Sequence, residues 1–206
     1  MEAGSLKPVR IDGRRLRSER TRVLIIEAFL SLAAENSPRL PTAAQIAERA
    51  GYSVRSIFER FDDMQALQLA ALDHALVQVA ATAPSIERQG DRLSRIASQV
   101  EGRALSCERW LPLWRALLAT RVDWPEMRER VAAARDRNIT RLALMYEPEL
   151  NGMTPSARRQ LLIVLEALLD VDSWARMREF FGLSFADASA SWRGAVDRLL
   201  PPTPAA

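Results

Sequence analysis

The stretch "TAAQIAERAGYSVRSIFERF", residues 42–61, decides the fold. Two short segments with helical periodicity flank "AGYS". Thr42 followed by Gln45 is a capping box, because the hydroxyl and the amide each satisfy a backbone group at the start of a helix. Gly51 lets the chain turn sharply, since glycine adopts left-handed dihedral angles without steric cost. Ser53 is then placed to cap a second helix, so the stretch predicts two helices joined by a tight turn.

The second of these helices has two distinct faces. Its apolar residues recur at the spacing of one helical face, which we expect to pack inward: Val54, Ile57, Phe58 and Phe61. The polar residues are left on the outer face: Ser53, Arg55, Ser56, Glu59 and Arg60. This arrangement predicts a helix-turn-helix, whose second helix enters the major groove of DNA. The alternative is an ordinary helical hairpin with a polar surface.

The composition is that of a soluble globular protein. The chain has 206 residues, of which 48% are hydrophobic and 27% are charged. Its longest apolar run is interrupted by Glu27 and is too short to cross a bilayer, so we expect no membrane partner. A single cysteine, Cys107, excludes a disulfide framework and a thiolate metal cluster. From this we expect a cytoplasmic protein.

The excess positive charge lies at the N-terminus. The net charge is +3; residues 1–62 hold 11 basic and 8 acidic side chains, whereas residues 63–206 hold 18 of each. A basic arm beside a small helical unit is typical of a polyanion binder, although a charge run is more often a solvated tail.

Helical periodicity continues along the rest of the chain and predicts an all-α fold of about nine helices. We expect a flexible basic arm over residues 1–17, a helix-turn-helix unit over 18–62, and a larger helical body over 63–206. The expected helices span 18–35, 42–50, 53–61, 63–83, 87–106, a shorter segment around 110–118, 125–145 with Asp123 as N-cap, 155–181 with Gly182 as its stop, and 184–199.

The stretch "TAAQIAERAGYSVRSIFERFDDMQAL", preceded by a helix and followed by an all-helical body, resembles the TetR/AcrR family of transcriptional regulators. The resemblance covers roughly residues 20–72. It implies a homodimer, an N-terminal three-helix DNA-binding unit, and a C-terminal body that holds a small-molecule pocket. It also favours release of DNA when the ligand binds, as in a repressor.

The chain departs from the family pattern at three positions. Phe58 stands where the family often has a tyrosine that reaches a phosphate, and Met64 stands where it often has a lysine. Arg60 replaces a frequent histidine. We therefore expect altered phosphate anchoring, with Arg60 and the basic arm as replacements.

The candidate DNA-binding residues are those that carry hydrogen-bond donors on the predicted outer surface. Arg55 is the leading candidate for base readout, since arginine can donate two hydrogen bonds to guanine; a phosphate contact is the alternative. Thr42 lies at a helix N-terminus, which favours anions. The full set is Arg14, Arg15, Arg17, Thr42, Ser53, Arg55, Ser56 and Arg60. A dimer would read a palindromic operator on double-stranded DNA, with half-sites about 34 Å apart or a multiple of that.

The predicted body supplies candidates for a ligand site and a dimer surface. An apolar or aromatic effector is expected near His74, Trp110, Trp114, Leu117, Met127, Met145 and Tyr146, although residues of these types are more often core than ligand contacts. The last two long helices offer a dimer interface that includes Leu161, Leu165, Leu168, Trp174, Met177, Phe181, Trp192 and Val196. The helix over 63–83 would connect the helix-turn-helix unit to the helical body.

Two other classes of function compete with this interpretation. An enzyme would need a nucleophile and base, a metal cluster or a phosphate loop, and one histidine with one cysteine supplies little of this. We therefore expect no catalytic residues, no cofactor and no metal. The second alternative, favoured by Phe58 and Met64, is a helical protein-interaction module that has lost DNA binding.

Overall fold

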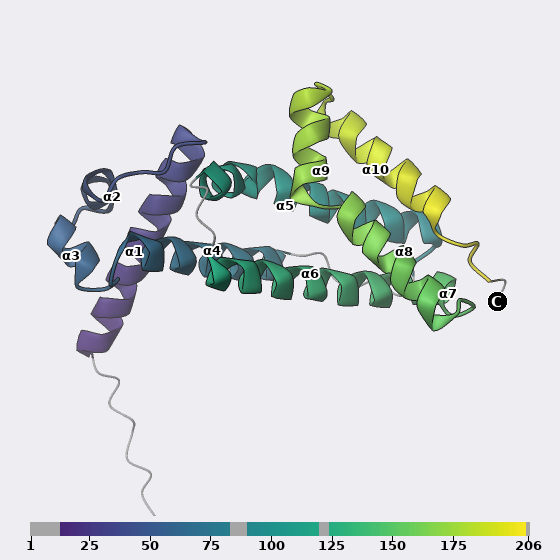
Figure 1. Ribbon diagram of the computed structural model, residues 1–206, viewed down its shortest axis with the longest axis horizontal. Helices are drawn as coiled ribbons and strands as arrows, with labels where there is room; N and C mark the ends of the chain where they lie inside the picture. The colour runs from purple at the N-terminus through teal and green to yellow at the C-terminus, as the bar shows by residue number, and fades with distance from the viewer. Residues whose placement is uncertain (1–12, 83–89, 120–123, 205–206) are drawn as a thin grey trace, which may run out of the picture.

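The structure is a computed structural model that describes residues 13–82, 90–119 and 124–204. This part of the chain forms ten α-helices and one π-helical turn, with no strand (Figure 1). The predicted all-α fold is therefore confirmed. None of the helices found in these residues is long and apolar enough to cross a membrane.

Three helices form the N-terminal unit: α1 (Gly13–Asn36), α2 (Ala43–Ala50) and α3 (Val54–Phe58). They lie together at one end of the molecule, away from α7, α8 and α10 (Figure 1). The helix α1 begins earlier than predicted, because residues 13–17, which were expected to belong to the flexible arm, are already helical. The rest of that predicted arm, residues 1–12, lies outside the described residues.

The turn between α2 and α3 has the predicted geometry. The backbone N–H of Thr42 donates to Oε1 of Gln45 at 2.9 Å, and the hydroxyl of Thr42 accepts from the Gln45 backbone N–H at 3.4 Å. Gly51 has φ of +73°, in the left-handed region. Oγ of Ser53 accepts from the backbone N–H of Ser56 at 3.1 Å and caps α3. The capping box, the glycine turn and the second cap are confirmed.

The inner face of α3 is narrower than predicted. Ile57 is fully buried and Phe61, just after the helix, is 3% exposed. Val54 and Phe58, which were expected to pack inward, are 39% and 46% exposed. A helix of five residues contributes about one turn to the core, so its two ends extend beyond the residues that cover it. Val54 and Phe58 therefore belong to the outer surface.

The body consists of three long helices and a set of shorter ones. The long helices are α4 (Met64–Thr82), α5 (Arg92–Ala119) and α6 (Pro125–Met145), which run along the length of the molecule in Figure 1. They are followed by α7 (Glu147–Leu150), α8 (Pro155–Leu168), α9 (Val171–Ala175), the π-helical turn η1 (Arg176–Phe180) and α10 (Phe185–Leu199).

Two predicted boundaries in the body are wrong. One continuous helix, α5, replaces the two helices expected there, and it contains Pro112. Proline removes one backbone N–H, but the helix continues through it, with buried residues on both sides that include Leu111 and Leu113. The helix expected over 155–181 ends instead at Leu168, where the carboxylate of Asp170 accepts from the Asp172 backbone N–H at 2.8 Å and starts α9.

The ends of the remaining body helices follow the sequence signals more closely. Pro125 lies in the first turn of α6, as predicted, but Trp124 occupies the N-cap position. Asp123, the predicted N-cap, lies outside the described residues. Gly182 has φ of +65° and follows the π-helical turn, so the predicted stop is confirmed.

Buried side chains form two hydrophobic cores. The N-terminal core includes Phe29, Ile46, Ile57 and Leu67, and it also takes in residues of α5. The C-terminal core packs α5, α6, α8, α9 and α10 together around Trp174 and other large side chains. Helix α5 therefore contributes to both cores and joins the two halves of the protein.

Charged residues close the far end of the C-terminal core. Arg95 and Glu149 form an ion pair in which their side chains are 5% and 0% exposed. The hydroxyl of Thr203 donates to the same carboxylate. Nearby, Arg92 donates to the carboxylate of Asp197 at 2.8 Å and to the Leu200 carbonyl at 3.0 Å. These contacts tie the C-terminal segment to the start of α5.

Removal of the buried carboxylate should destabilise the fold strongly. Glu149→Ala leaves the buried guanidinium of Arg95 without its counter-charge, and we expect a loss of about 3–5 kcal/mol in the free energy of unfolding. Glu59→Ala breaks an exposed pair with Arg55 and should cost no more than about 1 kcal/mol. Urea unfolding at a fixed protein concentration measures both; equal losses would contradict the structural role of the buried pair.

The substitution Gly51→Ala tests whether the left-handed backbone of the turn requires glycine. A Cβ at residue 51 would meet no atom within 4 Å, so any cost of Gly51→Ala comes from φ of +73° alone. We expect a loss of about 1–2 kcal/mol in the free energy of unfolding. A Cβ at Gly152 also meets nothing within 4 Å, and no positive φ is found there, so Gly152→Ala is the matched control. A Gly51→Ala variant as stable as this control would show that the turn does not need glycine.

Candidate functional site

Helix α3 presents an extended arginine on the outer surface of the N-terminal unit. The side chain of Arg55 is 88% exposed, and its Nε donates to Oε1 of Glu59 at 3.0 Å. Surface ion pairs contribute about 0–1 kcal/mol, so this guanidinium can exchange its partner for a nucleic acid at low cost. The hydroxyls of Ser53 and Ser56 lie 3.0 Å apart beside it, and Ser53 is also engaged as the helix cap.

Arg60 has a different role from the one predicted. Its Nη1 donates to the backbone carbonyl of Ser56 at 2.8 Å, and its side chain is only 22% exposed. Its own backbone carbonyl accepts from Nη1 of Arg22 at 3.1 Å, and the Arg22 guanidinium lies over the ring of Phe61, 4.5 Å from the centroid. Arg60 and Arg22 therefore fix the end of α3 against α1, a role that no sequence pattern indicated for Arg22.

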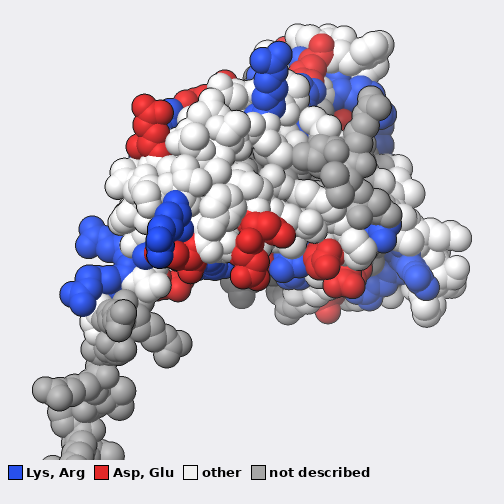
Figure 2. Space-filling view, turned by 60° about the vertical axis from the view of Figure 1, so that its left-hand side comes forward, with Lys and Arg blue, Asp and Glu red and all other residues white. Residues whose placement is uncertain are grey.

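The remaining predicted DNA-binding residues flank α3. Arg17 is exposed on α1, and Thr42 is exposed at the start of α2 with its hydroxyl engaged in the capping box. Arg14 and Arg15 lie in α1, but their side chains lie outside what the structure describes. Figure 2 shows Arg side chains beside the point where the described chain begins, with acidic residues close to them.

Two apolar members of this surface, Val54 and Phe58, were not predicted from the sequence. Both were expected in the core and both are exposed next to Arg55. Apolar side chains in a major groove contact the methyl group of thymine, so exposed apolar atoms are compatible with a base-reading surface. The outer face of α3 thus combines a guanidinium, hydroxyls and apolar groups.

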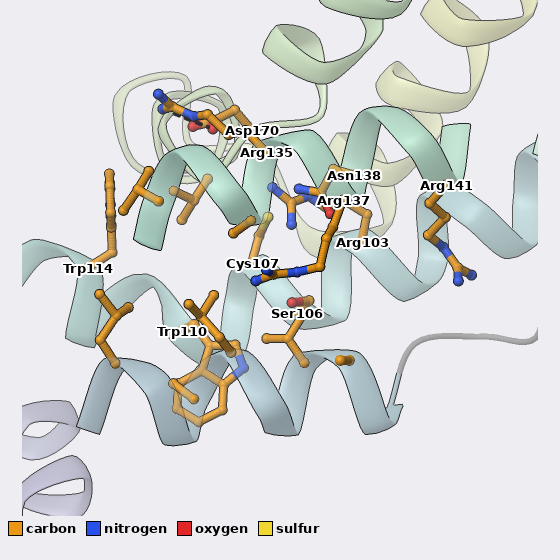
Figure 3. Close-up of a pocket in the computed structure, with 18 of the residues that line it drawn as sticks. Arg103, Ser106, Cys107, Trp110, Trp114, Arg135, Arg137, Asn138, Arg141 and Asp170 are labelled. Carbon is orange, nitrogen blue, oxygen red and sulfur yellow. Dashed lines mark hydrogen bonds and ion pairs between the residues drawn. The ribbon is translucent and has the colours of Figure 1, made fainter. Parts of the chain in front are cut away.

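A cavity of about 420 Å³ lies in the body between α4, α5 and α6 (Figure 3). Trp110, Trp114 and Leu117 line it, as do Leu72 and Ala75 of α4, so most of its wall is apolar. The indole N–H of Trp114 donates to the carboxylate of Asp172 at 2.8 Å and fixes that ring. The size and the lining are typical of a small-molecule site.

Four other predicted ligand-binding residues do not line this cavity. Met145 and Tyr146 are fully buried in the C-terminal core, so they pack against protein and are corrected to core residues. Met127 packs against the N-terminal core. His74 lies on α4 within hydrogen-bonding distance, 3.5 Å, of the Gln78 side-chain nitrogen.

Charged side chains that the sequence did not single out also line the cavity. Arg103 comes from α5, whereas Arg135, Arg137 and Arg141 come from α6, and Asp170 is the one acidic lining residue among those described. Arginine on an amphipathic helix is usually solvated, so the sequence pattern alone predicted no role for them. The structure brings them to one side of an apolar space.

Cys107 also faces this cavity, and it is 3% exposed. Burial raises the pKa of its thiol to about 11, because the thiolate would lose its hydration. The group is therefore a neutral apolar contact near pH 7. Among the described residues, no group of histidine, cysteine, aspartate and glutamate side chains could hold a metal ion.

The predicted dimer residues divide into two groups. Leu165, Trp174, Trp192 and Val196 are at most 1% exposed within the single chain. They are corrected to core residues, because a side chain already enclosed by its own chain offers no surface to a second copy. Leu161, Leu168 and Met177 are partly exposed and Phe181 is 62% exposed. Ile163 and Val164, which were not predicted, are each 49% exposed on α8.

The buried thiol should resist alkylation in the folded protein. Because its pKa is raised to about 11, the group stays protonated up to that pH, and its thiolate fraction at pH 8 is lower by about 100-fold than that of an ordinary thiol. We expect iodoacetamide to label Cys107 at pH 8 at least about 100-fold more slowly in the native protein than in urea. Mass spectrometry over time measures both rates, and equal rates would contradict the burial.

Comparison with known proteins addresses the fold. No family model and no curated protein matches the chain. A TetR-family transcriptional regulator from Streptomyces coelicolor has a TM-score of 0.75 and 18% identity, with 88% of this chain and 80% of that one covered. A transcriptional regulator from Rhodococcus sp. Rha1 has a TM-score of 0.69 and 16% identity over 89% and 99%. The multidrug binding protein EbrR, complexed with imidazole, has 0.61 and 18% over 89% and 96%. The chain therefore has the fold of the TetR-family transcriptional regulators.

Proposed function

We propose that this protein is a sequence-specific DNA-binding transcriptional regulator whose DNA affinity is controlled by a small molecule. The observation that carries the proposal is the outer face of α3, where an 88% exposed arginine projects from a helix that Gly51 and Ser53 fix in place. A helix of this kind in a helix-turn-helix enters the major groove, and arginine there reads guanine. Arg17 and the start of α2 lie on the same unit to contact the phosphate backbone.

A homodimer is the second part of the proposal. One short reading helix contacts few base pairs, so selectivity requires two copies on a palindromic operator. The exposed apolar side chains Ile163 and Val164 on α8, with the partly exposed Leu168, supply a surface that a second copy could cover. A symmetric contact through this helix would place two α3 helices on one side of a DNA duplex.

The proposed control works through residues that belong to both the cavity and the N-terminal core. Leu113 and Leu117 of α5 line the cavity and also pack in the core that holds Ile57. Leu72 and Ala75 of α4 do the same. A ligand that moves these side chains would disturb the core that holds α3, which would couple the two sites.

The effector is proposed to contain an aromatic or apolar part that packs on Trp110 and the leucines of the cavity. The similar structure of EbrR, a multidrug binding protein complexed with imidazole, supports a small-molecule role for this fold. We further propose that ligand binding releases DNA, so that the protein acts as a repressor. An effector that widens the cavity would change the spacing of the two reading helices and separate them from their half-sites.

Substitution of Arg55 tests whether α3 contacts DNA bases. Genomic fragments retained by the protein at low salt are sequenced to define the operator, and binding is then titrated by electrophoretic mobility. Arg55→Ala should lose about 1–3 kcal/mol of binding free energy and relax the preference at one base pair. Arg198→Ala, in the last turn of α10, removes the same charge from an exposed position far from α3 and should leave the affinity unchanged within error.

The outcomes separate the two functions considered. If the parent protein binds the operator and Arg55→Ala has the same affinity and sequence preference, Arg55 does not read a base. If the parent retains no DNA at low salt, the regulator proposal is wrong and the exposed Val54 and Phe58 favour a protein-interaction module instead. Affinity that falls steeply with salt supports the phosphate contacts.

A further inference from the structure

The arginines that line the cavity carry more positive charge than the acids around them neutralise. Among the described residues, four arginines and one aspartate line this space. Arg135 is satisfied, since it lies 3.5 Å from the carboxylate of Asp170 and 3.9 Å from that of Glu166. Glu166 also interacts electrostatically with Arg103, whereas Arg137 has no acidic partner among the described residues.

Arg103 is held with part of its guanidinium available. Its Nε donates to the backbone carbonyl of Leu169 at 2.6 Å, which fixes the side chain where α8 ends and α9 begins. Its two terminal nitrogens make no hydrogen bond to any residue that the structure describes. A guanidinium fixed at Nε and open at its terminal nitrogens is well arranged to donate two parallel hydrogen bonds to an oxyanion.

Arg137 approaches the same space from α6. It makes no hydrogen bond or ion pair with any residue in the described part of the chain, and its side chain is exposed, so it lies where the cavity meets solvent. In Figure 3, Arg103 and Arg137 extend into the space above Trp110. Two cationic groups therefore lie beside an apolar compartment, at one side of it.

Arg141 adds to the positive potential in a partly dry setting. Its Nε donates to the side-chain oxygen of Gln99 at 3.0 Å, and burial lowers the pKa of its guanidinium. An anion in the cavity would offset the cost of holding this charge away from water. Asp170 and Glu166 lie close to Arg135, and Arg137 has no carboxylate partner among the described residues.

Resting on the proposed function, we propose that the effector is an amphipathic anion. Its aromatic or branched apolar body packs on Trp110, Leu113 and Leu117, and its singly charged oxyanion, of the carboxylate or sulfonate kind, is bound by Arg103 and Arg137. A neutral molecule of equal size would fill the apolar space but leave the two guanidinium groups without an anion. The cavity therefore selects for charge as well as shape.

A matched pair of fluorescent probes tests this selection. Anilinonaphthalene sulfonate and phenylnaphthylamine share their aromatic rings and differ in the sulfonate, and both gain emission in apolar sites. Arg137→Gln should weaken the sulfonate probe about fivefold, and Arg103→Gln with Arg137→Gln should weaken it about twentyfold, since charge-assisted hydrogen bonds are lost. The affinity of phenylnaphthylamine should change by less than about twofold in each variant.

Two control variants assign the binding to the cavity. Arg39→Gln removes one exposed arginine of the N-terminal unit and should leave both probe affinities unchanged. Ala134→Trp places a large ring into the lining and should abolish binding of both probes. Circular dichroism of each variant confirms that the helices are intact. An Arg137→Lys variant that recovers part of the sulfonate affinity supports a charge contact.

The possible results distinguish the two proposals. If Ala134→Trp abolishes both probes but the arginine variants leave the ratio of the two affinities unchanged, the cavity is a ligand site and the anion proposal is overturned. If neither probe binds, or Ala134→Trp leaves binding intact, the small-molecule site itself is wrong, and the anion proposal falls with it. Since these assays contain no DNA, neither result depends on whether α3 binds DNA.

Discussion

The position of α3 depends on one enclosed side chain. Ile57 is the only fully buried residue within this five-residue helix, and Phe61 follows it just beyond the helix end. A helix this short cannot be stable alone, because nucleation is unfavourable and few hydrogen bonds follow it. Its orientation is therefore set by the packing around Ile57 and by the Ser53 cap. Arg60 also holds it, because its side chain donates to the Ser56 carbonyl of α3 and its backbone carbonyl accepts from Arg22 of α1. Any change in the core beneath is transmitted to the surface that Arg55 occupies.

That core is continuous with the wall of the cavity. Leu113 and Leu117 have one side in the N-terminal core and another at the cavity, and Leu72 and Ala75 do likewise from α4. Well-packed cores respond to added volume by shifting whole helices, since side chains have few other arrangements available. Helix α6, which forms another wall of the cavity, is linked to α4 by an ion pair of 2.7 Å between Arg130 and Asp73. Side chains that line the cavity therefore belong to the same core as Ile57 of α3.

Sequence patterns were reliable where a local interaction determines the structure. The Thr42 capping box, the Gly51 turn and the Ser53 cap involve residues three or four positions apart, and all three form as predicted. Helix boundaries in the body failed where tertiary packing overrides a local signal, as when α5 continues through Pro112. The break at Leu168 is marked by Asp170, a capping residue that the strong apolar periodicity of 155–181 concealed.

The candidate sites were harder to predict than the fold, because they depend on which face of each helix is covered. Val54 and Phe58 have the spacing of an inner face, yet too little protein lies over the ends of α3 to bury them. Trp110 and Trp114 were found from their residue type, whereas the arginines on α5 and α6 look like solvated residues in the sequence. Only the packing of α4, α5 and α6 shows that they share a cavity. Burial within the chain likewise removes Trp174 and Trp192 from the proposed dimer surface.

The two cores are closed by different interactions. The C-terminal core is closed by the tilted pair Trp174 and Trp192, whose ring centroids lie 4.8 Å apart, and by the buried ion pair of Arg95 with Glu149. Displacing either would cost several contacts at once, so this half resists deformation. The cavity borders both cores, since Leu117 belongs to the N-terminal core and Cys107 to the C-terminal core. Under the proposed ligand control, a molecule between α4, α5 and α6 would act on α3 through Leu113 and Leu117, because these side chains belong to the core that holds Ile57.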